Sequence, residues 1–149
     1  MHAEKCTHPR LAIYLFGHPE FRRGNEALPP LATHKSQSLL AYLILHRQRP
    51  HSRDQLAALL WGDQDDVHVR RSLATALWRI RRLLGEGYLL ADSSSVQFNP
   101  TRPFWLDVAK FEKHLTLGRK EPDEKRAAGH WRQAVDLYRN DLLEGFYDD

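Results

Sequence analysis

The sequence of 149 residues predicts an α+β protein with short strands at two places and helices between and after them. β-branched and aromatic residues form short runs bounded by glycine and proline within residues 11–23 and 88–98, and such runs are typical of small antiparallel sheets. In the longer segments between and after these runs, apolar residues recur every three or four positions, which is the spacing of one helix face. The two patterns together favour strands, then helices, then a hairpin and further helices.

A pair of antiparallel strands is expected to open the fold. The runs Leu11–Phe16 and Glu20–Arg23 flank Gly17 and Pro19, which favour a turn between them. Because proline has no backbone N–H, Pro29–Pro30 limits anything beyond this pair to an edge strand.

Two helices are predicted next, each with a recognisable start. Thr33 is a favourable N-cap for a first helix from about residue 34 to residue 47. Ser52 stands three residues before Gln55, the spacing of a capping box, and opens a second helix that ends before Gly62. The apolar stripes at helical spacing are Leu39, Leu40, Leu43 and Ile44 in the first helix and Leu56, Leu59 and Leu60 in the second.

A third helix, from about residue 67 to residue 84, contains five arginines and no acidic residue. Asp63, Asp65 and Asp66 precede it, where the helix dipole favours negative charge. On a helical wheel of 100° per residue its apolar face consists of Leu73, Leu77, Ile80 and Leu84. The opposite face carries Arg71, Thr75, Trp78 and Arg82, with His68 and Arg79 near its edge. We therefore expect one face to be buried and the other to be exposed and positive.

A small hairpin is predicted after the third helix. Gly85 and Gly87 end that helix, and residues 88–92 and 96–98 are expected to be strands around the turn Ser93–Ser95. The order of elements is that of a winged helix-turn-helix with an N-terminal antiparallel sheet and a C-terminal wing hairpin, assigned here to residues 1–100. Because phosphate contacts need only Arg and Lys within reach, a basic third helix before a hairpin makes double-stranded DNA the predicted partner.

Residues 101–149 are expected to form a second domain that begins with an αα-hairpin of the helical-repeat, TPR-like type. One helix is marked by Val108, Phe111 and Leu115, and the other by Trp131, Val135, Tyr138 and Leu142. The segment Gly118–Pro122 is expected to join them. Because stacked repeats cover both faces of such a hairpin with further helices, we expect this domain to be truncated. Trp61, Trp105 and Trp131 are expected in a core or at a domain junction.

Composition and charge exclude several classes of protein. The net charge is +3, and residues 1–100 hold 13 Lys and Arg against 9 Asp and Glu, so the basic excess lies in the predicted DNA-binding part. The single cysteine, Cys6, excludes an internal disulfide framework. There is neither a signal-peptide pattern nor an apolar run of membrane-spanning length. We expect a soluble, cytoplasmic protein.

Five segments in this order resemble the SARP-type bacterial transcriptional activators, whose DNA-binding domain is a winged helix of the OmpR/PhoB kind. The first three segments are Lys35–Leu43, Ser52–Trp61 and Arg71–Leu84. The last two, Trp105–Phe111 and Leu137–Tyr147, are similar to the start of the bacterial transcriptional activator domain of that family. The resemblance covers nearly the whole chain beyond residue 10.

The resemblance implies that the third helix lies in the major groove. By matching position, Arg71, Thr75 and Trp78 approach bases, whereas Arg79 and Arg82 approach phosphates, with His68 at the edge of the same surface. Trp78 departs from the family, in which this position is usually polar or basic.

The resemblance also implies that the hairpin touches the neighbouring backbone or the minor groove. Ser93–Ser95 has no Arg or Lys at the tip of this wing, so insertion into the minor groove is expected to be weak. Binding to direct repeats, RNA polymerase as a partner and a monomer in solution are further implications of the resemblance.

Other interpretations stay open at this point. Arg71 can pair with Asp65 or Asp66, and Trp78 can pack on a neighbouring domain instead of facing DNA. The same surfaces can also serve a protein–protein interaction module without specific DNA binding. The nine histidines show no tight metal-ligand pattern. Because the sequence lacks a glycine-rich phosphate loop and a nucleophile elbow, we expect neither a cofactor nor an enzymatic activity.

Overall fold

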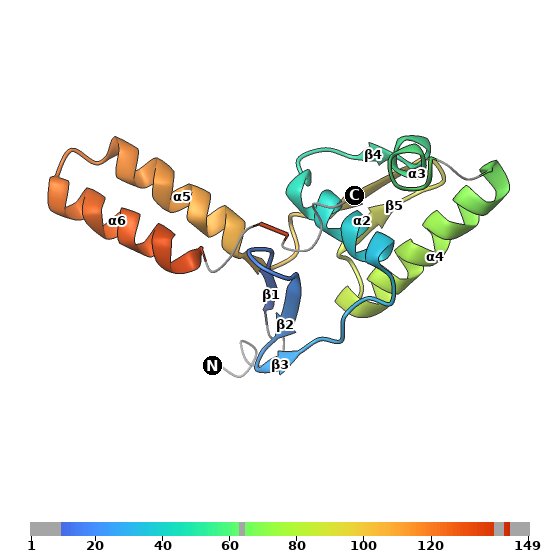
Figure 1. Ribbon diagram of the computed structural model, residues 1–149, viewed down its shortest axis with the longest axis horizontal. Helices are drawn as coiled ribbons and strands as arrows, with labels where there is room; N and C mark the ends of the chain where they lie inside the picture. Colours follow the sequence, from blue (N-terminus) through green and yellow to red (C-terminus); the bar gives the residue numbers. More distant parts are fainter. Residues whose placement is uncertain (1–9, 63–64, 139–141, 144–149) are drawn as a thin grey trace. The chain divides into compact units, whose positions relative to one another are not determined.

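The computed structural model describes residues 10–62, 65–138 and 142–143 (Figure 1). Cys6 and Asp63, on which predictions were made, lie outside these residues. The fold is α+β, as predicted. The chain divides into two compact units, of which one is Pro29–Pro103 and the other combines the residues up to Leu28 with those from Phe104 onward. None of the described helices is long and apolar enough to cross a membrane.

This division differs from the boundary predicted at residue 100. Strand β1 (Leu11–Tyr14) pairs in parallel with β7 (Phe104–Leu106), so that Leu11 lies opposite Phe104. The N-terminal strands therefore share a sheet with the strand that leads into the C-terminal helices, and the winged-helix elements occupy the other unit.

The first sheet has four strands in the order β3-β2-β1-β7. Strand β2 (Glu20–Arg23) is antiparallel to β1, as predicted, and β3 (Glu26–Ala27) is a short edge strand next to it. Leu11 and Ile13 alternate with more exposed neighbours and are fully buried, which is the period of a strand with one covered face. The parallel partner β7 makes this sheet mixed rather than purely antiparallel.

A buried carboxylate joins this sheet to the first C-terminal helix, α5 (Asp107–Lys120). Asp107 is 1% exposed. Its carboxylate accepts hydrogen bonds from the backbone N–H groups of Leu15 at 3.0 Å and of Phe16 at 3.0 Å. Phe16 in turn places its ring 5.2 Å from the rings of Phe111 and Tyr138, so the end of β1 is fixed against the hairpin.

The C-terminal hairpin consists of α5 and α6 (Glu124–Leu137). The predicted connection at Gly118–Pro122 is wrong at its start, because Gly118 is buried within α5. A Cβ atom at residue 118 would come within 2.9 Å of the Trp131 ring, so the glycine permits the close approach of the two helices. Trp105 instead packs against Tyr14, with ring centroids 5.2 Å apart.

The predicted stripe of the second helix extends too far. Helix α6 ends at Leu137, and Tyr138 is its C-cap. Leu142 lies opposite Phe16 in an isolated β-bridge, and the Leu143 N–H donates to the Leu15 carbonyl at 2.8 Å. Pairing with the end of β1 therefore replaces the further helical turns that the spacing suggested.

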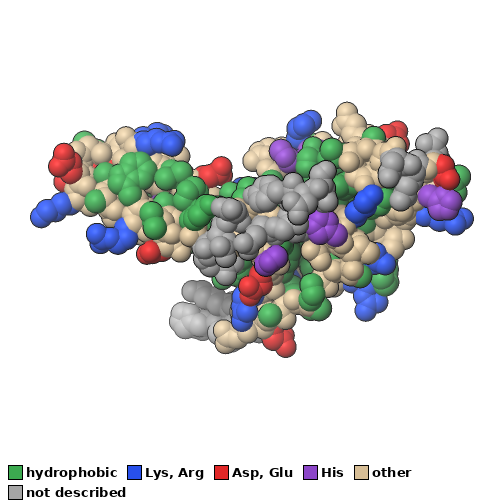
Figure 2. Space-filling view, in the orientation of Figure 1, with side chains coloured by type: hydrophobic (Ala, Val, Ile, Leu, Met, Phe, Trp, Pro, Cys, Tyr) green, Lys and Arg blue, Asp and Glu red, His purple; other side chains and the backbone are tan. Residues whose placement is uncertain are grey.

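Apolar side chains remain exposed on the hairpin, and Figure 2 shows them on its visible face. Val135, predicted to mark the packed stripe, is 68% exposed, and the buried residue of α6 is its neighbour Ala134. The exposed large apolar side chains of the hairpin and its end are Leu117, Trp131, Val135 and Tyr138.

Two histidines meet between these helices. The Nδ1 atoms of His114 and His130 are 3.3 Å apart. Burial, followed by the nearby His130, Lys113 and Lys110, lowers the pKa of His114 below its ordinary value of 6.5. The contact requires at least one neutral ring, since one nitrogen donates and the other accepts.

The unit Pro29–Pro103 contains three helices, α2 (His34–Leu45), α3 (Arg53–Trp61) and α4 (Asp66–Leu84). Both predicted caps are confirmed: Thr33 Oγ1 accepts from the Ser36 N–H at 3.0 Å, and Ser52 Oγ accepts from the Gln55 N–H at 3.2 Å. The fully buried side chains contributed by α2 and α3 are Leu39, Leu40, Leu43, Ile44 and Leu56. Leu59, predicted in the apolar stripe of α3, is 57% exposed, and Ala57 and Trp61 are buried instead.

The wing hairpin consists of β5 (Leu89–Ala91) and β6 (Ser95–Phe98), close to the predicted ranges. A third strand, β4 (His51–Ser52), pairs with β6 and gives the sheet order β4-β6-β5. At the turn, Asp92 Oδ1 accepts from the N–H groups of Ser94 at 2.8 Å and Ser95 at 2.7 Å. These two bonds hold the pKa of Asp92 below its ordinary value, so the wing tip carries an exposed carboxylate.

Candidate nucleic-acid interface

Helix α4 has the two faces that its sequence predicts. Leu73, Leu77, Ile80 and Leu84 are between 0% and 3% exposed. On the other side, Arg71, Thr75, Trp78 and Arg82 are exposed and Arg79 is half-buried. The burial of the leucines therefore fixes the rotation of the helix, and with it the side chains that face outward.

The first turn of α4 is organised by its N-cap. Asp65 Oδ1 accepts from the backbone N–H of His68 at 3.0 Å, and both carboxylate oxygens lie 2.9 Å from His68 Nδ1. The backbone N–H of His68, and then its ring, hold the pKa of Asp65 below the ordinary value of 3.8. Among the described side chains, the Asp65 carboxylate therefore contacts the His68 ring and not the Arg71 guanidinium.

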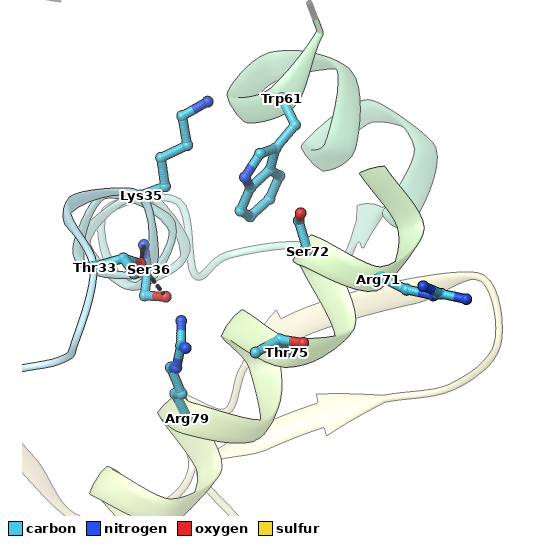
Figure 3. A pocket seen from close by; sticks show the side chains of 8 residues that line it. All are labelled: Thr33, Lys35, Ser36, Trp61, Arg71, Ser72, Thr75 and Arg79. Atoms are coloured by element: carbon cyan, nitrogen blue, oxygen red, sulfur yellow. Dashed lines mark hydrogen bonds between the residues drawn. The ribbon is translucent and has the colours of Figure 1, made fainter. Parts of the chain in front are cut away.

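Three of the predicted site residues line one hollow of about 350 Å³ (Figure 3). Arg71, Thr75 and Arg79 come from the exposed side of α4. In Figure 3 the Arg79 side chain extends toward the start of α2, whereas Arg71 points away from the hollow. The other lining residues, from α2, its cap, α3 and α4, are Thr33, Lys35, Ser36, Trp61 and Ser72.

The chemistry of this hollow suits an anion. Lys35 and Arg79 supply positive charge, hydroxyl groups come from Ser36, Ser72 and Thr75, and the lining contains no carboxylate. The start of α2 adds the positive end of a helix dipole. Lys35 Nζ lies 5.9 Å from the centroid of the Trp61 ring, a cation–π distance that keeps the ammonium beside the hollow.

Sequence reasoning missed the contribution of α2 and α3 to this hollow. Thr33 and Ser36 carry a cap signal, and Lys35 is a cation in the first turn of the same helix. Nothing in the local pattern indicates that Trp61 closes the same space, because that contact depends on the packing of three helices.

Trp78 and Arg82 form a second group farther along α4. The Arg82 guanidinium lies 5.0 Å from the centroid of the Trp78 ring, and Trp78 is 55% exposed. Both line a hollow of about 370 Å³ with Arg81, Gly85, Glu86, Gly87 and Leu89. The predicted site residues therefore divide into a group at the cationic hollow and an aromatic–cationic group, with His68 outside both.

The cation nearest the wing tip comes from outside the wing. Its turn has no Arg or Lys, but the Arg53 Nε donates to the Asp92 carbonyl at 2.8 Å. Arg53 is the first residue of α3, so the positive charge next to the wing tip belongs to the helix-turn-helix. Among the described residues, no three His, Cys, Asp or Glu side chains gather in a way that could hold a metal ion.

Known proteins are similar to this chain in sequence and in fold. Residues 29–92 match the family described as "Transcriptional regulatory protein, C terminal", a range that takes in α2, β4, α3, α4 and β5. The regulatory protein AfsR of Streptomyces coelicolor is 25% identical over 114 residues, which make up 74% of this chain and 12% of that protein.

A solved structure described as "Mycobacterium tuberculosis EmbR in complex with low affinity phosphopeptide" has the same fold. It superposes with a TM-score of 0.80 at 24% identity and covers 94% of this chain and 39% of that chain. The chain thus spans well under two thirds of the length of either protein. Residues 29–92, less than half of the chain, thus match a transcriptional regulatory domain, and the chain is similar to AfsR and shares its fold with EmbR.

Proposed function

We propose that this chain binds double-stranded DNA sequence-specifically, as the DNA-binding part of a transcription activator, with α4 in the major groove. The observation that carries the proposal is the exposed side of α4, which presents arginines beside a cationic, hydroxyl-lined hollow. An α-helix fits the major groove, where base edges differ in their hydrogen-bonding patterns. A face of this composition satisfies both requirements of such a reader, because it has polar groups for bases and cations for phosphates.

Base contacts are assigned to Arg71 and Thr75. Both are exposed and lie one helical turn apart, and Arg71 extends outward from α4 (Figure 3). An arginine that reaches a base edge pairs with guanine O6 and N7, which is the commonest specific contact. His68, held by Asp65 at the exposed start of the helix, is assigned a contact at the edge of the interface.

Phosphate contacts are assigned to the hollow and to Arg82. A backbone phosphate seated in the hollow receives charge from Lys35 and Arg79 and a hydrogen bond from the Ser72 hydroxyl beside them. The start of α2 orients its dipole favourably toward the same phosphate. Such contacts fix the position of the protein on the duplex without selecting its sequence.

The wing is assigned a minor part in binding. Its tip carries the Asp92 carboxylate, which like-charge repulsion disfavours next to a phosphate. Arg53, bonded to the Asp92 carbonyl, is the cation that approaches the backbone on this side.

The likeness to the SARP-type regulators extends the proposal to architecture. We expect two copies of a monomeric protein to bind head to tail on a direct repeat, and RNA polymerase to be the partner through which activation occurs. A two-fold dimer in the absence of DNA, detected by light scattering, contradicts this part of the proposal.

The salt dependence of DNA binding tests the proposal. Log affinity for duplex DNA is expected to fall with log salt concentration by about 0.9 for every phosphate neutralised. Lys35→Ala is expected to reduce that slope by about 0.9, since it removes one phosphate contact. Lys125→Ala, which removes the same charge from an exposed site on α6, is the matched control and is expected to leave the slope unchanged.

Two outcomes contradict the proposal. Absence of duplex binding at low salt leaves the protein–protein interaction module as the better account of the surface. If Lys35→Ala and Lys125→Ala reduce the salt slope equally, the protein attracts DNA by diffuse charge and no phosphate is seated in the hollow.

A further inference from the structure

Trp78 is out of place on a purely polar DNA-reading surface. It is the only Trp, Tyr or Phe residue in α4, and it is 55% exposed although tryptophan is costly to leave in water. Seven residues after Arg71 and three after Thr75, it lies on the same outward face as both. The side chain therefore points to the surface that the proposed function directs toward base edges.

The ring is also held in place. The Arg82 guanidinium lies 5.0 Å from its centroid, which restricts the rotamers of the indole through a cation–π contact. Arg82 itself is exposed, so the indole presents an apolar surface with a positive charge beside it. Such a surface loses less conformational entropy on binding than a free tryptophan.

The major groove offers one exocyclic apolar group, the C5 methyl group of thymine. We propose that Trp78 makes the chain specific for thymine by packing its indole against this methyl group. The inference rests on the proposed function, because it requires α4 to lie in the major groove. At 1.5 Å per residue Trp78 stands about 10 Å along the helix from Arg71, so the two side chains reach different base pairs.

Two other roles of Trp78 make different predictions. The indole N–H can donate to an acceptor on a base edge, and this contact does not depend on a methyl group. The ring can also pack against another protein segment, in which case its removal leaves discrimination between bases unchanged.

Replacing thymine by deoxyuridine separates these roles, because the substitution removes the methyl group and leaves the pairing edge intact. Preferred duplexes are first selected from a random library with the full chain. Each thymine of the consensus is then replaced in turn by deoxyuridine, and affinities are measured by fluorescence anisotropy.

The chain is expected to lose about fourfold in affinity at one thymine position, the ratio that corresponds to one buried methyl group. Trp78→Ala and Trp78→Gln are expected to bind thymine and deoxyuridine at that position equally well. Arg71→Ala, the control, is expected to bind more weakly overall and to retain the fourfold ratio. Because Trp78 is exposed, both of its variants are expected to unfold at the same temperature as the parent chain.

Three results overturn the inference. If the parent chain selects a sequence but is indifferent to deoxyuridine at every position, DNA recognition stands and the methyl contact does not. If both Trp78 variants keep the fourfold ratio, another residue reads the methyl group. If no sequence is selected at all, the proposed function and this inference fail together.

Discussion

The carboxylate of Asp107 accepts a hydrogen bond from the backbone N–H of Leu15 at 3.0 Å, across a sequence separation of 92 residues. It also accepts from Phe16 and from Val108, so one buried side chain joins the end of β1 to the start of α5. Burial of a carboxylate is favourable when several N–H groups donate hydrogen bonds to it. Burial of the same N–H groups without an acceptor costs free energy.

Asp107→Ala is expected to lower the free energy of unfolding by about 2–5 kcal/mol, because the two buried N–H groups that follow β1 lose their acceptor. Asp107→Asn keeps one oxygen acceptor and is expected to cost less. Asp136→Ala, at an exposed position of α6, is the control for removal of a carboxylate. Urea denaturation followed by circular dichroism measures all three, and an unchanged midpoint for Asp107→Ala contradicts the structural role.

Leu77→Ala is expected to destabilise the winged-helix unit by about 2–5 kcal/mol, because it leaves a cavity under α4. Leu77 is 1% exposed, whereas Thr75 is exposed on the opposite side. Thr75→Ala is therefore expected to leave thermal stability nearly unchanged and to weaken specific DNA binding. If Leu77→Ala does not change the melting temperature, the assignment of faces on α4 is wrong, and the assigned DNA contacts change with it.

Arg71 and Arg82 are expected to differ in what they contribute to binding. Arg71→Ala is expected to cost about 1–3 kcal/mol on the preferred site and to relax the choice of one base. Arg82→Ala is expected to weaken preferred and random duplexes by similar factors, since phosphate contacts carry no sequence information. Competition assays with both kinds of duplex measure the difference. Equal ratios for the two variants refute the division into base and phosphate contacts.

The contact between His114 and His130 predicts a pH dependence of stability. Because the pKa of His114 is lowered in the folded chain, the unfolded chain binds more protons as the pH falls below the ordinary value near 6.5. The contribution of His114 to stability is therefore expected to be complete above that value and to decline as the pH falls below it. His114→Gln is expected to flatten this decline, and melting temperatures of both proteins across the range test it. A parent protein whose melting temperature is the same above and below pH 6.5 contradicts the prediction.

The local signals in the sequence predicted most of the winged-helix unit. Thr33 and Ser52 cap their helices as expected, because a cap depends on a hydrogen bond three residues away. The buried side of α4 was also predictable, since nineteen residues with a clear period leave little choice of rotation.

The features that the sequence did not predict depend on contacts between distant segments. The two residues of β4 and the three of β7 are too short to show a period, and they become strands only because β6 and β1 lie beside them. Leu142 fits the helical spacing of α6, but pairing with Phe16 overrides that preference. In the candidate site, the exposed arginines of α4 followed from periodicity, whereas the meeting of Lys35 and Trp61 required the packed helices.

The two units predict which fragment carries DNA binding. Residues 29–103 hold the whole unit, and we expect this fragment to unfold cooperatively and to bind duplex DNA. Residues 1–100 keep β1 without β7 or Asp107, so Leu11 and Ile13 lose the partners that bury them. This second fragment is expected to be prone to aggregation and protease cleavage within its first 28 residues. A protease-resistant fragment 1–100 contradicts the assignment of β1 to the C-terminal unit.

The pairing of β1 with β7 also sets an order of events during synthesis of the chain. Residues 29–103 emerge from the ribosome as a continuous stretch, and this unit can fold as soon as it is released. Strand β1, although made earlier, has to wait for Phe104 to emerge before its parallel neighbour exists. At typical translation rates of about 5–20 residues per second, the roughly 90 residues between β1 and β7 take about 5–18 s. During that time Leu11 and Ile13 are exposed to solvent, so this strand is completed after the unit that follows it in the sequence, and we expect chaperones to bind it.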